Sequence, residues 1–134
     1  MAQEMRSPIE SGCPDAFQYM HPVMRKNYGQ WAYHEDPQPG VLLHVSNNGD
    51  KIWTVRAGTQ RILDVFTLRK LCDIGDEYGE GYIHFTIRSN IEYQVADEAK
   101  VQPLIKAIED AGFIVGGTRN SVAMLSHTQG WLHC

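Results

Sequence analysis

Two arginines close strand-like segments near the middle of the chain. The segments are Trp53-Thr-Val-Arg56 and, 32 residues later, Phe85-Thr-Ile-Arg88. Because alternate residues of a strand point to opposite faces of a sheet, each arginine lies on the polar side of its strand, as does the threonine before it. A guanidinium group binds a carboxylate or a sulfur oxyanion through two parallel hydrogen bonds. The pattern predicts an anion-binding sheet face or, as the plainer alternative, a face that meets water.

A third arginine lies in a glycine-hinged loop, Gly116-Gly-Thr-Arg-Asn-Ser121, whose amides and hydroxyls are suited to an anion nest. This loop leads to a polar and aromatic run, His127-Thr-Gln-Gly-Trp-Leu-His-Cys134. His127 and His133 have no third ligand at a spacing that metals require. We therefore predict no metal site within this chain.

Composition excludes several classes of protein. The three cysteines, Cys13, Cys72 and Cys134, form no CxxC pair, which argues against a zinc ribbon and a self-contained iron–sulfur motif. The formal net charge of -4 argues against a general nucleic-acid binder, because such proteins need a broad basic surface. No apolar signal-peptide core and no stretch of transmembrane length is present, so we predict a cytoplasmic protein without membrane insertion.

Hydrophobic alternation predicts strands at 41–45, 52–56, 82–88, 91–95 and 113–115. The sequence Asn47-Asn-Gly-Asp50 predicts a tight hairpin turn between the first two strands. In the strand at 82–88, Ile83, Phe85 and Ile87 are expected to point into the core.

Helical spacing of apolar residues predicts two helices. The first is expected from Thr67, as N-cap, to Tyr78, with Cys72 on its buried stripe. The second follows Val101, carries Pro103 in its first turn, and is ended by a glycine at 112.

The predicted order from 52 to 115 is strand, helix, strand, strand, helix, strand. This order is typical of an α+β, ferredoxin-like split βαβ half-domain with an antiparallel sheet. Two helices are expected to cover one face of that sheet and to leave the other face open. Alternation assigns these residues to the open face: Thr54, Arg56, His84, Thr86, Arg88, Glu92 and Gln94. We predict an extended N-terminal arm at 1–40, the half-domain at 41–115, and the start of a further domain at 116–134.

Several motifs together carry a family resemblance. They are His21-Pro-Val-Met-Arg-Lys-Asn-Tyr-Gly29, Trp31 with Tyr33-His34-Glu35, Pro39-Gly-Val41, Gly49-Asp-Lys51, Thr54-Val-Arg56, Cys72-Asp-Ile74, Phe85-Thr-Ile-Arg88-Ser-Asn90, Val95-Ala-Asp-Glu-Ala99 and His127-Thr-Gln-Gly-Trp131. As a set they resemble the N-terminal part of the beta subunits of dissimilatory sulfite reductases, nearer to the reverse-acting, sulfur-oxidising branch.

The resemblance implies a fragment of a larger redox enzyme. It implies an α2β2 complex with an alpha subunit, in which sulfite and sulfide are interconverted by six electrons on sirohaem coupled to a [4Fe–4S] cluster. Residues 41–115 would be the nitrite/sulfite reductase ferredoxin-like half-domain, and 116–134 the truncated start of the sirohaem/[4Fe–4S] domain. Since the family's cluster cysteines lie beyond this chain, we expect the isolated fragment to hold no cofactor and to be inactive.

Carried over position by position, the resemblance also implies site residues. Arg119 takes the catalytic place, in contact with substrate or haem. The cofactor-binding positions are Arg56, Thr86, Arg88, Asn90, Arg119, Asn120, His127, Thr128, Gln129 and Trp131.

Two other readings remain open from the residues alone. A stand-alone ferredoxin-like module that binds small anions or mediates interactions explains the fold equally well. A purely structural domain predicts that Arg56 and Arg88 are held in salt bridges. Glu92 is the only acidic residue assigned to their face, so full neutralisation is not expected.

Overall fold

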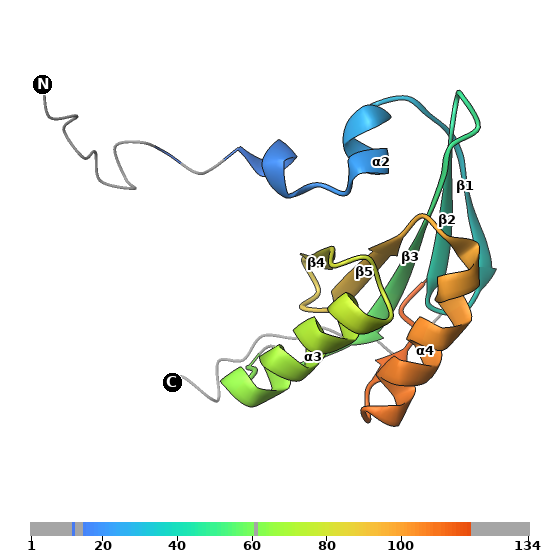
Figure 1. Ribbon diagram of the computed structural model, residues 1–134. Coiled ribbons are helices and arrows are strands. Elements are labelled where there is room, and N and C mark those ends of the chain that lie inside the picture. Colours follow the sequence, from blue (N-terminus) through green and yellow to red (C-terminus); the bar gives the residue numbers. More distant parts are fainter. Residues whose placement is uncertain (1–11, 13–14, 61, 119–134) are drawn as a thin grey trace, which may run out of the picture.

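A computed structural model describes residue 12 and residues 15–60 and 62–118 (Figure 1). The elements in chain order are η1 (Ala16–Tyr19), α2 (Pro22–Lys26), β1 (Trp31–Gln38), β2 (Val41–Ser46), β3 (Lys51–Gly58), α3 (Val65–Glu77), β4 (Ile83–Phe85), β5 (Ile91–Val95), η2 (Glu98–Lys100), α4 (Val101–Asp110) and β6 (Ile114–Val115). The strands form one sheet in the order β1-β2-β3-β5-β4, and β6 also pairs with β3.

The sheet confirms the predicted α+β class. Within it, β6, β3, β5 and β4 lie side by side in that order and pair antiparallel. This is the arrangement of a split βαβ unit, in which β3 and β5 are the central strands. Figure 1 shows α3 and α4 together on one face of the sheet. The hairpin turn between β2 and β3 is also confirmed, with Gly49 in the left-handed region at φ 87°.

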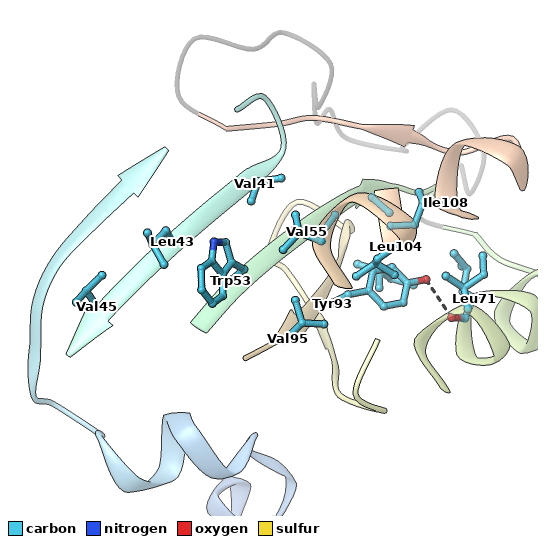
Figure 2. Packing of buried hydrophobic residues seen from close by; sticks show 14 residues of the cluster. Val41, Leu43, Val45, Trp53, Val55, Leu71, Tyr93, Val95, Leu104 and Ile108 are labelled. Atoms are coloured by element: carbon cyan, nitrogen blue, oxygen red, sulfur yellow. Dashed lines mark hydrogen bonds between the residues drawn. The ribbon is translucent and has the colours of Figure 1, made fainter. Parts of the chain in front are cut away.

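The core lies between the two helices and the strands β2, β3 and β5 (Figure 2). Tyr93 of β5 has no exposed surface, and its hydroxyl donates a hydrogen bond to Leu71 O of α3 at 3.0 Å. Leu104 and Ile108 of α4 are equally buried against the same strands. Each such side chain stabilises the fold by about 1.5–3 kcal/mol through burial. The predicted stripe of the second helix is therefore confirmed.

The first helix begins earlier than predicted. Its N-cap is Asp64, whose Oδ1 accepts a hydrogen bond from Thr67 N at 2.8 Å. Thr67 is therefore inside the helix, and the prediction that it caps the helix is wrong. An aspartate three residues before a backbone N–H satisfies one of the free donors of the first turn. The buried stripe includes Ile74, whereas Cys72 is exposed, which corrects the prediction of a core cysteine.

The strand predicted at 82–88 is shorter. β4 ends at Phe85, because the backbone turns back at once: Thr86 N donates to the carbonyl of residue 90 at 2.8 Å. The side chain of Phe85 is 54% exposed and that of Ile87 is 99% exposed, so the prediction that both point into the core is wrong. β4 is an edge strand, and the core row on this side is supplied by β5.

The segment predicted as an extended arm supplies part of the sheet. Its residues 31–38 form β1, which pairs antiparallel with β2 at the sheet edge. Upstream, His21 is 4% exposed and contacts Glu80 Oε2 at 2.7 Å. Asn27, 1% exposed, donates to Asp50 Oδ2 at 2.9 Å. These contacts anchor the segment around α2 to the body of the domain.

Candidate functional site

Strand register brings the polar residues of β3, β5 and β4 together on the sheet face opposite the helices. Thr54 lies opposite Gln94, and Arg56 lies opposite Glu92. On the other side of β5, His84 also lies opposite Glu92. The shared face predicted for these five side chains is therefore present. It is less open than expected, since Thr54 is 5% exposed and Glu92 is 7% exposed.

The N-terminal segment shares a pocket with another part of this face. Residues of η1 and α2 and of β4 and β5 line one pocket of about 370 Å³: Ala16, Tyr19, Met20, Met24, Ile83, His84, Phe85 and Gln94. The lining is mostly apolar, so this part of the face is not suited to a polyanion.

Arg56 is paired within the chain. Its Nε donates to Glu92 Oε1 at 2.7 Å, and its Nη2 donates to the same oxygen. Its Nη1 donates to the carbonyl of Gly117. The side chain is 15% exposed. Glu92 thus neutralises Arg56, as the purely structural reading predicted for this one of the two arginines.

His84 completes a three-residue network on this face. Its Nδ1 lies 3.1 Å from Glu92 Oε2. This hydrogen bond raises the pKa of His84 above its ordinary value of 6.5, although partial burial opposes the change. Burial raises the pKa of Glu92, but the hydrogen bonds from His84 and Arg56 and the charge of Arg56 outweigh it, so that pKa is lowered overall. Glu92 is therefore a buried carboxylate that stays charged at neutral pH.

Arg88 lies elsewhere, in the turn that joins β4 to β5. It is exposed, and no described residue forms a hydrogen bond or ion pair with it. Because β4 ends at Phe85, strand alternation does not extend to Arg88, and its predicted place on the face of Arg56 is wrong. The salt bridge that the purely structural reading predicted for Arg88 is also not found among the described residues.

The turn at 86–90 is held by hydroxyl groups. Thr86 Oγ1 accepts from Asn90 N at 3.2 Å, and Thr59 Oγ1 donates to Ser89 O at 2.6 Å. Ser89 has φ 64°, a left-handed conformation that is uncommon for a residue other than glycine and often marks a functional site. The contacts therefore fix the backbone on either side of Arg88.

Asn90 is the buried polar group of this turn. It is 2% exposed, and its Nδ2 has no hydrogen-bond partner among the described residues. Leaving such a donor unpaired costs about 1–3 kcal/mol, so Asn90 is a candidate for pairing with an acceptor that the described chain does not supply. Two residues earlier in the same turn, Arg88 is exposed and has no partner among the described residues. The two donors suit a carboxylate or another oxyanion.

The segment before Arg119 runs along the end of β3. Gly116 N donates to Arg56 O at 3.2 Å, and Thr118 Oγ1 accepts from Gly40 N at 3.0 Å. A Cβ at Gly40 would lie 2.5 Å from Gly116 N, so these two glycines permit a close approach of the backbones. The other predicted site residues lie outside the described part of the chain: Arg119, Asn120, His127, Thr128, Gln129 and Trp131.

Sequence reasoning missed the pairing of Arg56 with Glu92 and the support of the turn by Thr59. The pairing of Arg56 with Glu92 could in principle have been predicted, because each residue lies in a strand that the sequence predicts. Thr59 carries no local signal, since its partner is 30 residues away.

Two general searches are negative within the described residues. No group of three or more histidine, cysteine, aspartate or glutamate side chains is placed to hold a metal ion. None of the helices described here combines the length and apolar character that crossing a membrane would need.

A known protein family matches the part of the chain that contains the central strands of the sheet and its two helices. The nitrite/sulfite reductase ferredoxin-like half domain matches residues 44–111, which include β3 to α4 and thus the Arg56 network and the turn. The chain belongs to this family. The match confirms the predicted half-domain fold.

Curated relatives of this chain include three beta subunits of dissimilatory-type sulfite reductases. The protein from Archaeoglobus fulgidus is 47% identical over 122 residues, 86% of this chain and 33% of the relative. The one from Nitratidesulfovibrio vulgaris is 44% identical over 124 residues, 87% of this chain and 32% of the relative. The one from Megalodesulfovibrio gigas is 37% identical over 141 residues, 99% of this chain and 54% of the relative. The predicted resemblance is confirmed, and the chain spans about a third to a half of these relatives.

Proposed function

We propose that this chain is the N-terminal part of the beta subunit of a dissimilatory sulfite reductase and forms one wall of a sirohaem site. The observation that carries the proposal is the turn at 86–90, where the buried Asn90 Nδ2 lacks a partner and Arg88 is unpaired among the described residues. Three similar proteins are named as such beta subunits, which supports the reaction class.

The residues of the turn fit the chemistry of this macrocycle. Sirohaem has eight carboxylates on its rim, which need hydrogen-bond donors and positive charge. Asn90 supplies an amide donor whose desolvation is not compensated within the described chain, and Arg88 supplies a planar cation. Thr86 keeps its hydroxyl in the same turn, where it accepts from Asn90 N. We propose that these three side chains hold carboxylates of the ring.

Arg56 serves the site through the backbone in this proposal. Its guanidinium is engaged by Glu92 and by the carbonyl of Gly117, two residues before Arg119. It thereby sets the direction in which the chain reaches Arg119, for which we propose contact with the anionic substrate or the haem. Asn120, His127, Thr128, Gln129 and Trp131 are proposed to contact the macrocycle.

The complete enzyme is proposed to be a cytoplasmic α2β2 complex with an alpha subunit, acting on sulfite and sulfide by six-electron transfer. When bound, sirohaem coupled to a [4Fe–4S] cluster supplies the redox chemistry. The share of the chain's own residues is to bind and orient anions: guanidinium and amide donors concentrate positive potential where an oxyanion and carboxylates converge. The isolated chain is proposed to hold neither group.

The proposal is tested in the assembled complex. Asn90→Ala should lower the sirohaem content per heterodimer at least several-fold, because no described residue pairs with the lost amide and would otherwise explain its role. Arg69→Ala, which removes an exposed arginine of α3 on the helix-covered side, is the control and should leave the content unchanged. Unchanged sirohaem content and sulfite turnover in the Asn90 variant would contradict the proposal. A loss of sulfite binding without loss of sirohaem would favour a small-anion module instead.

A further inference from the structure

The edge of the sheet farthest from the turn at 86–90 carries a pair of histidines in direct contact. His34 of β1 and His44 of β2 lie opposite each other in the antiparallel register. Their Nδ1 atoms are 2.6 Å apart, and the ring planes are inclined by 74°. His34 is exposed, while His44 is half-buried. The site lies beyond β3 and β5 from the turn, so it does not depend on the proposed sirohaem site.

We propose that His34 and His44 bind one divalent transition-metal ion through their Nδ1 atoms, with water completing the coordination. Two imidazole nitrogens that lie within hydrogen-bond distance of each other supply the minimal pair of ligands for Cu²⁺, Ni²⁺ or Zn²⁺, and imidazole is a preferred ligand of all three.

The spacing needs little change to accept an ion. A metal about 2.0–2.1 Å from each nitrogen, with an angle of roughly 90–110° between them, requires a nitrogen–nitrogen distance of about 2.9–3.4 Å. The rings are 2.6 Å apart at these atoms when they share a hydrogen bond. They must therefore separate by less than about 1 Å. Because His34 is exposed at the sheet edge, its ring is free to make that movement and water can reach the ion.

A second contact is compatible with the required form of His44. Its Nε2 lies 3.2 Å from Thr54 Oγ1, which is able to accept a hydrogen bond from an Nε2–H group. In that tautomer the lone pair is on Nδ1 and points to the space shared with His34. Hydrogen bonds to the distal ring nitrogen orient metal-binding histidines in this way.

Trp31 of β1 lies beside both rings. Its ring centroid is 6.3 Å from that of His34 and 6.0 Å from that of His44. The pair is thus packed beside an aromatic ring of its own strand, and the chelate is partly preorganised. A bound ion would join β1 to β2 and stabilise the pairing of the edge strand with the sheet, in proportion to its affinity.

The test is calorimetric titration of the metal-free 134-residue chain with NiCl₂ and with ZnCl₂. We expect one ion per chain, with Ni²⁺ bound more tightly than Zn²⁺ or similarly, and affinity lowered at least about tenfold in both His34→Ala and His44→Ala. Thr54→Val, which keeps both ligands, should weaken binding by about tenfold through loss of orientation alone.

His133→Ala is the control, because the C-terminal run also contains histidine. Binding that is unchanged in this variant and lost in His34→Ala supports the site. Binding that survives in His34→Ala, or that is lost in His133→Ala, overturns the proposal. Because His34 is exposed, its alanine variant removes a ligand without disturbing the core.

Discussion

The network around Glu92 offers the most quantitative test of what holds the polar face of the sheet together. Arg56→Met removes the guanidinium and keeps a side chain of similar length. Glu92, whose side chain is 9% exposed, then loses the donors Nε and Nη2 and retains only the contact with His84. The carbonyl of Gly117 loses its donor as well.

Breaking a buried ion pair on one side costs about 3–5 kcal/mol. Because the Arg56 side chain is still 15% exposed, water replaces part of the lost solvation, and we expect a value near the lower end, about 3 kcal/mol. This is a large fraction of the roughly 5–15 kcal/mol by which domains are stable. Urea unfolding followed by circular dichroism measures the change.

A double variant separates the pair from its surroundings. In Arg56→Met/Glu92→Leu both charges are replaced by apolar groups, and most of the loss should be recovered, since no unpaired charge remains. A loss below about 1 kcal/mol in the single variant, typical of an exposed pair, would refute the reasoning. So would a double variant that is at least as unstable as the sum of both single variants.

Two further predictions concern the same region. The raised pKa of His84 means that its contact with Glu92 stabilises the fold fully below pH 6.5, and this contribution is lost as the pH rises through the raised pKa. The lowered pKa of Glu92 gives a second contribution, which is present above pH 4.5 and is lost as the pH falls through the lowered pKa. The urea midpoint of the unmodified chain should therefore exceed that of His84→Gln by the largest amount between pH 4.5 and pH 6.5. A difference that is equally large at alkaline pH would argue against the network. Gly40→Ala combines a left-handed backbone at φ 80° with a Cβ placed 2.5 Å from Gly116 N, so we expect the free energy of unfolding to fall by at least about 2 kcal/mol. Gly29→Ala, at φ 72° with no atom near its Cβ, is the control and should lower it by less. Equal losses in the two glycine variants, again measured by urea unfolding, would show that the close approach contributes nothing.

The elements that were predicted well are those with strong local signals. Pro103 in the first turn and the glycine at 112 with φ 90° mark the ends of α4, and its apolar stripe is regular. The alternation in β5 places Tyr93 in the core. Local propensity and burial agree in both elements, so the sequence alone was sufficient.

The errors arise where distant contacts or a single backbone angle decide. Thr86-Ile-Arg88 continues the alternation of β4, but the left-handed Ser89 turns the chain back and exposes Ile87. β1 lies in a proline-rich segment and is a strand because β2 is available to pair with it. The unpaired amide of Asn90 is a property of the folded turn, and no local sequence pattern predicts the burial of a polar side chain there.

The central claim is that the turn at 86–90 holds carboxylates of sirohaem, and one measurement tests it most directly. The alpha subunit and the complete beta subunit are co-expressed with Arg88→Ala or with the control Arg69→Ala, and sirohaem per heterodimer is quantified by absorbance after extraction. Arg88 is exposed and unpaired among the described residues, so its removal leaves the fold intact. The account predicts a several-fold loss of sirohaem in the Arg88 variant and none in the control. Full sirohaem content in both would contradict it.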